Sequence, residues 1–188
     1  MENKNLSLIG KLLFFSPSDR GPSYFTNSLI FICDHSSEGT VGLIINRQID
    51  LMTNNLLKGV GLETKDLISP KNLLIGGPVN PGSVFILHSN NKTWDSTLKV
   101  TEEISLSTSK DTLVDIAKND TPKDYLITLG YAGWTEGQLE QELSENAWIT
   151  APGDFNIIFR TEPKDQIIAV SKLLGFDITM VSPEFGNA

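Results

Sequence analysis

Short runs of apolar residues, bounded by Gly, Pro, Ser and Asn, dominate the hydropathy pattern of this chain. Runs of this length between turn residues are typical of β-strands. The first clear run, Lys11–Phe15, predicts a strand that ends at Ser16-Pro17-Ser18-Asp19. Further strands are predicted at Leu73–Gly76, Ser83–His88, Ser96–Val100, Ile104–Ser107, Tyr125–Gly130, Phe155–Arg160 and Ile178–Val181.

Two neighbouring runs predict a β-hairpin. Ser28–Cys33 and Thr40–Ile45 are rich in β-branched and large apolar residues, and a polar turn, His35-Ser36-Ser37-Glu38-Gly39, separates them. Glycine adopts positive φ angles without steric cost, so Gly39 suits the tight connection.

Helix patterns are fewer, and most of them begin at a residue that favours a helix N-terminus. Thr135 and Gln138 have the spacing of a capping box, and Leu139 and Leu143 would form the buried stripe of the helix that follows. The predicted helices run from Thr108 or Ser109 to Asn119, from Thr135 to Asn146, from Pro163 to Gly175 and, with a weaker pattern, from Thr53 to Val60.

Many strands with single helices between them favour an α+β fold with a mixed, largely antiparallel sheet and a few flanking helices. Strict β-α-β-α alternation is missing from the pattern, which makes a doubly wound fold the less favoured alternative. At 188 residues the chain suits a single compact domain over residues 1–188, and a chain of this size buries about 70% of its unfolded surface.

The charge balance narrows the choice of partners. Lys and Arg number 15 and Asp and Glu 23, a net charge of −8, and the basic residues are scattered. Phosphates are repelled by such a surface, so we do not expect direct nucleic-acid binding.

We expect no membrane segment, because no window approaches the roughly 20 apolar residues a spanning helix needs. The single cysteine, Cys33, fits a reducing compartment, so the expected location is the cytoplasm.

Metal or nucleophile chemistry would have to use Cys33, His35 and His88. Cys33 and His35 are two residues apart and would share a strand face. A zinc or iron site needs further ligands, and only His88 and scattered carboxylates remain. A Cys33–His35 nucleophile pair is the other alternative, but a cysteine in an apolar strand is usually an inert core residue. We therefore expect a buried thiol beside a strand-end histidine, no metal and no cofactor.

Glycines and aromatic residues gather in two other segments. Gly76-Gly77-Pro78-Val79 follows an apolar strand and predicts a turn that lets another element pass closely, since no phosphate-binding motif surrounds it. Leu129–Trp148 holds two of the three tryptophans beside three glycines, which indicates close, specific packing. The pattern places Tyr131 and Trp134 in a loop at the N-terminus of the helix capped by Thr135.

Several ordered motifs resemble the bacterial YqgE/AlgH proteins. The signature segments are Gly130-Tyr131-Ala132-Gly133-Trp134, Gly137-Gln138-Leu139-Glu140 and Asn146-Ala147-Trp148, and similar stretches lie at Ser28–His35, Gly42–Asn46, Gly76–Val79 and Ile157–Phe159. The matches run from about Leu8 to Asp177. The resemblance implies a compact α+β fold with a coiled, bifurcated sheet and no established activity, and some members carry the label of transcriptional regulator.

Our leading hypothesis is a binding or regulatory module without catalytic activity, with an unknown protein or small-molecule partner. Its groove would be shaped by the two indoles and their flanking glycines, and the candidate residues are Gly76, Gly77, Pro78, Gly130, Tyr131, Trp134, Gln138, Glu142 and Trp148. One alternative is a hydrolase-like enzyme that uses carboxylates such as Asp34 or Glu142. The other is a regulator that acts directly on DNA, although the sequence contains no helix-turn-helix pattern or basic reading helix.

Overall fold

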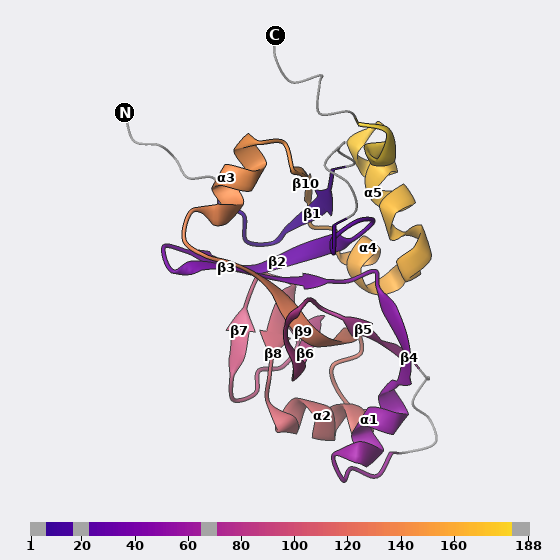
Figure 1. The fold of residues 1–188 in the computed structure, drawn as a ribbon. Helices are drawn as coiled ribbons and strands as arrows, with labels where there is room; N and C mark the ends of the chain where they lie inside the picture. The colour runs from indigo at the N-terminus through magenta and orange to yellow at the C-terminus, as the bar shows by residue number, and fades with distance from the viewer. Residues whose placement is uncertain (1–6, 17–22, 65–70, 182–188) are drawn as a thin grey trace.

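The structure is a computed structural model that describes residues 7–16, 23–64 and 71–181. Within these residues ten strands pair into one curled sheet, with helices at its two ends (Figure 1). The strands are β1 (Lys11–Phe15), β2 (Leu29–Ser36), β3 (Gly39–Ile44), β4 (Gln48–Met52), β5 (Asn72–Ile75), β6 (Val79–Ser89), β7 (Thr97–Lys99), β8 (Ile104–Ser107), β9 (Tyr125–Trp134) and β10 (Trp148–Pro152). The helices are α1 (Thr53–Gly59), α2 (Lys110–Ala117), α3 (Gln138–Ser144), α4 (Phe155–Arg160) and α5 (Gln166–Leu174), with the 3₁₀ turns η1 (Pro163–Asp165) and η2 (Ile178–Met180).

Strand β9 is the point at which the sheet branches. The strand order is β10-β1-β2-β3-β9-β6-β8-β7, and β4 pairs with β5, which in turn pairs with β9. The first half of β9 pairs with β6 and β5, whereas its end, Ala132–Trp134, pairs with β3. The β5–β9 pair is parallel and the other pairs are antiparallel. The predicted α+β class with a mixed, largely antiparallel sheet is therefore confirmed.

Both faces of the β2–β3 hairpin are buried, which explains its unbroken apolar run. Leu29, Phe31 and Cys33 pack into a core with residues of α4 and α5. The alternate residues, Ile30 and Ile32, pack on the opposite face with Trp134, Leu139 and Trp148. Fully burying one such aliphatic side chain contributes about 1.5–3 kcal/mol, so the hairpin anchors both cores. A third core lies under α1 and α2.

The predicted hairpin, the strand Lys11–Phe15 and the helices at Thr53, Ser109 and Pro163 are confirmed. The Ser109 side chain accepts from the amide of Asp111, as its position before the helix predicted. None of the helices in the described ranges is both long and apolar enough to cross a membrane.

Two predicted strands are helical instead. Phe155–Arg160 forms α4, because Asp154 Oδ1 accepts from the amide of Ile157 at 2.9 Å and caps the first turn. Ile178–Val181 begins as the 3₁₀ turn η2, where Asp177 Oδ1 accepts from the amide of Thr179 at 2.9 Å. In both cases a capping aspartate outweighs the β-propensity of the apolar residues that follow.

The boundary between β9 and α3 also differs from the prediction. The strand continues to Trp134, so Tyr131 and Trp134 lie in the sheet and not in a loop at a helix N-terminus. The helix starts at Gln138, and Gly137 with φ 69° takes the N-cap position. Half of the predicted capping box is present, since Gln138 Oε1 accepts from the amide of Thr135 at 3.0 Å. Strands β4 and β10 were not predicted.

Candidate functional site

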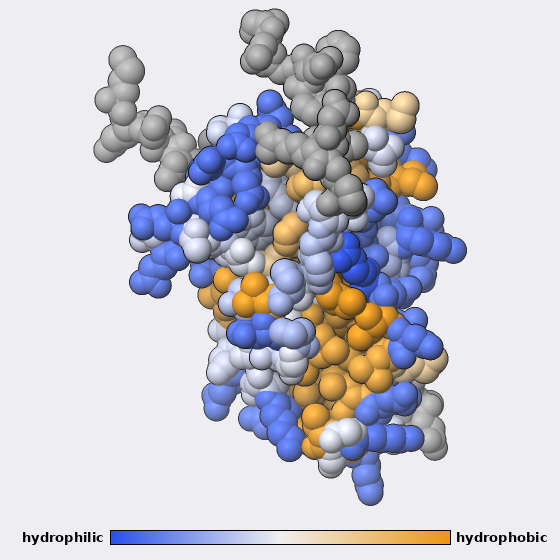
Figure 2. Space-filling view, in the orientation of Figure 1, coloured by the Kyte–Doolittle hydropathy of each residue, from blue (hydrophilic) through white to orange (hydrophobic). Residues whose placement is uncertain are grey.

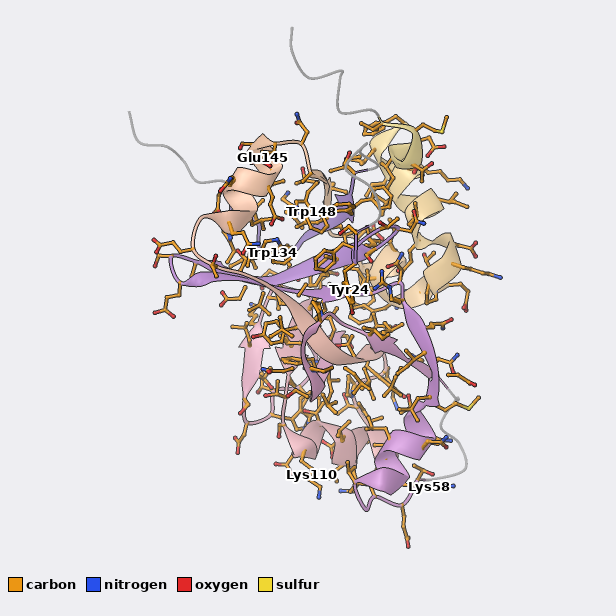
Figure 3. All side chains as sticks on the ribbon, viewed as in Figure 1. Tyr24, Lys58, Lys110, Trp134, Glu145 and Trp148 are labelled. Atoms are coloured by element: carbon orange, nitrogen blue, oxygen red, sulfur yellow. The ribbon has the colours of Figure 1, made fainter. Side chains whose placement is uncertain are left out.

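Two tryptophans from different strands bind one carboxylate. Trp134 ends β9 and Trp148 begins β10, and α3 connects the two strands in the chain; Figure 3 shows both tryptophans below this helix. Their indole nitrogens donate to the same oxygen of Glu142, Oε2, at 2.9 and 2.7 Å. Both side chains are only 5% exposed, so the rings fill the interior beneath α3 and do not line an open cleft on their own.

Further contacts complete this cluster. Gln138 Nε2 donates to the other oxygen of Glu142, Oε1, at 2.8 Å. The ring of Phe25 stacks on Trp134 at 6.3 Å between centroids and meets Trp148 edge-on at 5.5 Å. Hydrogen bonds to an ionised acceptor are roughly twice as strong as neutral ones. The carboxylate therefore fixes both rings, and we name Trp134, Gln138, Glu142, Trp148 and Phe25 the indole cluster.

The predicted glycine turn packs directly against β9. A Cβ atom on Gly77 would lie 2.1 Å from the carbonyl carbon of Tyr131, and one on Gly130 would lie 2.5 Å from the oxygen of Gly77. The amide of Gly76 donates to the carbonyl of Leu129 at 2.8 Å. Only glycine allows this backbone-to-backbone approach, which confirms the predicted close crossing.

A surface hollow of about 440 Å³ lies between the glycine turn and the indole cluster. Its apolar part comes from Val41, Val79 and Tyr131, all half-buried, and two carboxylates, Asp34 and Glu38, join its lining. The remaining lining residues are Ser36, Gly39, Thr40, Gly133, Trp134 and Thr135. We name it the Tyr131 hollow.

A second hollow of about 490 Å³ adjoins the first, because Ser36 lines both. It contains Glu136, Glu140 and His35, whose Nε2 lies 3.3 Å from Glu140 Oε1 and whose Nδ1 lies 2.8 Å from Thr40 Oγ1. Hydrophilic side chains cover α3 and the tip of the β2–β3 hairpin (Figure 2). Neither hollow has a lysine or arginine in its described lining. We name the four carboxylates, Asp34, Glu38, Glu136 and Glu140, the acidic face.

The nine residues predicted for the groove thus fall into two adjoining groups. One is the glycine crossing and the other is the indole cluster, and Tyr131 and Trp134 line the hollow between them. Val79 closes the predicted Gly76–Val79 turn, whereas Glu38 and Val41 were not predicted. No local pattern marks them, because they reach the hollow only through the pairing of β3 with β9, a contact between residues distant in the chain.

Two of the residues considered for metal or nucleophile chemistry, Cys33 and His88, are buried. Cys33 is buried beside Phe31, and burial, with a smaller effect of Asp34, raises the pKa of its thiol well above the usual range. His88 is buried on β6, with Nε2 2.8 Å from Ser107 Oγ and Nδ1 3.0 Å from the Ser89 carbonyl. Across the described residues, His, Cys, Asp and Glu side chains do not gather in threes suited to a metal ion.

The described residues define an α+β protein whose branched, curled sheet carries an acidic surface beside a buried indole cluster. A family model described as AlgH-like matches residues 12–179. The chain belongs to this AlgH-like family.

Full-length relatives and solved structures agree with this assignment. The chain is 39% identical over its whole length to a UPF0301 protein of Thiobacillus denitrificans, which it covers completely. It is 40% identical to a UPF0301 protein of Shewanella woodyi, over 97% of this chain and 99% of that one. The solution structure of the AlgH protein from Pseudomonas aeruginosa superposes with a TM-score of 0.80 at 33% identity, with both chains fully covered. A crystal structure from Corynebacterium diphtheriae shares the fold at 21% identity and a TM-score of 0.67, over 92% of this chain and 90% of that one.

Proposed function

We propose that this protein is a binding module without catalytic activity, and that the Tyr131 hollow and the acidic face hold a basic segment of a protein partner. The observation that carries the proposal is the combination of an apolar floor with surrounding carboxylates. Val41, Val79 and Tyr131 offer apolar contact, while Asp34 and Glu38 offer acceptors for lysine or arginine side chains. A segment that alternates apolar and basic residues would make the apolar contacts and also pair with the carboxylates.

The energetics favour a reversible complex. An exposed ion pair contributes about 0.2–1 kcal/mol, so four carboxylates alone give modest affinity. The net charge of −8 adds long-range attraction for a basic partner and speeds association. Weak, fast binding of this kind suits a regulatory role.

The two alternatives, a hydrolase-like enzyme and a regulator that binds DNA directly, fit the same residues less well. Of the two carboxylates named for a hydrolase-like enzyme, Glu142 has both oxygens occupied by the indole cluster, and Asp34 Oδ1 accepts from the amide of His35 at 2.9 Å. A protein that binds DNA through this surface would bring phosphates to the acidic face, where like charges repel. A regulatory role would therefore act through a protein partner. The free Cys33 fits a reducing compartment, so we set this interaction in the cytoplasm.

Substitution at the rim of the hollow tests the proposal better than substitution of Trp134. Removing a buried tryptophan side chain costs about 3–5 kcal/mol, which would confuse lost binding with lost folding. Asp34→Asn with Glu38→Gln removes two carboxylates from the hollow. Asp50→Asn with Glu63→Gln removes two exposed carboxylates at the α1 end of the molecule and is the charge-matched control.

The experiment is affinity capture from native lysate with the wild type and both double variants, followed by cross-linking of the captured partner. We expect the wild type and the control to retain the same partner, cross-linked through a basic segment, and the Asp34/Glu38 variant to lose it. Raised salt should also release it, because exposed charges are screened. Equal retention by all three proteins would overturn the proposal.

A further inference from the structure

A cleft on another side of the molecule runs between the sheet and the C-terminal helices. It has a volume of about 370 Å³, within the range of small-molecule sites. One wall comes from β4, β5 and β9, and the other from α4, η1 and α5. Leu74, Tyr125 and Phe159 supply apolar and aromatic surface.

Two cationic side chains, Lys71 and Arg160, line this cleft from opposite walls, together with one carboxylate, Glu162. Lys71 precedes β5, and its Nζ lies 4.4 Å from the centroid of the Tyr125 ring and 3.4 Å from the Tyr125 carbonyl oxygen. Burial lowers the pKa of Lys71, and the nearby carboxylate of Asp124 partly offsets this effect. A half-buried ammonium held by a carbonyl and a ring gains from an anionic partner.

Arg160 ends α4 on the other wall. Its Nε lies 3.4 Å from Asp124 Oδ1 and its Nη1 3.4 Å from Asn156 Oδ1, both long for charge-assisted hydrogen bonds. The side chain is 61% exposed, so these contacts hold it weakly. The planar guanidinium carries five N–H donors and suits bidentate binding of a carboxylate or phosphate.

Gln166, at the start of α5, provides a buried hydrogen-bond acceptor at the cleft. It is only 1% exposed, and its Nε2 donates to the carbonyls of Ile157 and Ile158 at 3.0 and 3.3 Å. Those two bonds fix the orientation of the amide, and its Oε1 has no hydrogen-bond partner among the described residues. A buried acceptor without a partner costs about 1–3 kcal/mol, which a donor on a ligand would recover.

We propose that this cleft binds a small organic anion: a carboxylate or phosphate between Lys71 and Arg160, an apolar or aromatic body, and a hydroxyl that donates to Gln166. The cleft shares no lining residue with the acidic face, and its lining holds two cationic side chains, Lys71 and Arg160, and one carboxylate, Glu162. The proposal is therefore independent of the protein–protein function, and each can fail alone.

NMR titration of the ¹⁵N-labelled full chain tests the proposal. The probes are 4-hydroxybenzoate and phenyl phosphate, which separate carboxylate from phosphate recognition. Benzoate lacks the hydroxyl and 4-hydroxybenzamide lacks the charge. We expect at least one anionic probe to bind at millimolar concentration or below and to shift the amide signals of residues around the cleft. We expect the uncharged 4-hydroxybenzamide to bind at least about tenfold more weakly. A preference for 4-hydroxybenzoate over benzoate would support the role of Gln166.

Charge-matched variants complete the test. Lys71→Gln with Arg160→Gln should weaken binding of the anion at least about tenfold, whereas Lys58→Gln with Lys172→Gln, both exposed and outside the cleft, should change it less than about twofold. Unfolding midpoints in urea verify that each variant is folded. If neither anion shifts the cleft amides at about 10 mM, or if both double variants lose affinity equally, the cleft is not an anion site.

Discussion

The indole nitrogens of Trp134 and Trp148 donate to one and the same oxygen of Glu142, at 2.9 and 2.7 Å. This shared acceptor joins the end of β9 to the start of β10 through α3. It also explains why the segment carries glutamate and two tryptophans: the rings need burial and their N–H groups need an acceptor. The cluster therefore stabilises the wall of the Tyr131 hollow, which it lines through Trp134.

Loss of the shared acceptor should destabilise the fold. Glu142→Ala leaves two buried indole N–H groups unpaired and should lower the free energy of unfolding by about 2–4 kcal/mol. Glu142→Gln should cost less, since its amide oxygen can still accept, although its NH₂ would face Gln138 Nε2. Urea unfolding followed by circular dichroism measures both. The exposed Glu136→Ala is the control, expected within about 0.5 kcal/mol of the wild type, and an equally small effect of Glu142→Ala would contradict the cluster's structural role.

The glycine crossing predicts a sharp contrast between two glycines. A methyl group on Gly77 would overlap the backbone of Tyr131, so Gly77→Ala should destabilise by at least about 1–3 kcal/mol. A methyl group on Gly82 would have no neighbouring atom within 4 Å, so Gly82→Ala should be neutral or stabilising by up to about 1 kcal/mol. Thermal unfolding of the two variants compares them directly. Similar midpoints would mean that the turn and β9 are not in contact.

Cys33 should be unreactive in the folded protein. Its thiol is buried and its pKa is raised, so little of the reactive thiolate is present at neutral pH. Labelling with dithionitrobenzoate at pH 8 should be slow in buffer and complete within the mixing time of a denaturing urea solution. Rapid labelling of the native protein would show that the thiol is accessible and would reopen the nucleophile hypothesis.

His88 should make stability depend on pH on the acidic side of neutrality. Burial lowers the pKa of the folded ring below the ordinary value of 6.5, and the Ser89 carbonyl offsets only part of that shift. Between the two values the unfolded chain binds more protons than the folded chain, so the free energy of unfolding falls as pH is lowered from about 7 through 6.5 toward the folded pKa.

Comparison with His88→Gln isolates this contribution. The variant lacks the titrating ring, so its stability should fall less steeply over the same pH range, whatever its stability at pH 7. Urea midpoints at half-unit pH steps give both slopes. Parallel slopes for the two proteins would show that His88 takes up its proton equally in both states.

The sequence predicted the fold correctly where the apolar runs and helix-capping residues of a segment match its burial in the structure. The continuous apolar run in Ser28–Cys33 indicated a strand, and Ser109 and Pro163 marked true helix starts. The prediction was wrong at Phe155–Arg160, where packing on the sheet and the Asp154 cap override strand propensity. The end of β9 was missed because Gly130 and Gly133 resemble a loop but serve close strand packing.

The candidate site was predictable only in part, because some of its residues meet through contacts between distant parts of the chain. Aromatic–glycine clustering indicated Tyr131 and Trp134, and the structure places both at the hollow. Glu38 joins them only because β3 pairs with β9, a contact between residues distant in the chain. The anion cleft left no sequence pattern, since Lys71, Arg160 and Gln166 come from separate parts of the chain: the residue before β5, the end of α4 and the start of α5.

The most direct measurement of the central claim is NMR shift mapping of the full chain with a short peptide that alternates lysine and leucine. The account predicts the largest amide shifts at Asp34, Glu38, Tyr131, Gly133 and Thr135, with affinity that falls as salt is raised and that Asp34→Asn with Glu38→Gln reduces. Shifts centred elsewhere, or an affinity unchanged by those two substitutions, would contradict the assignment of this surface to a basic partner.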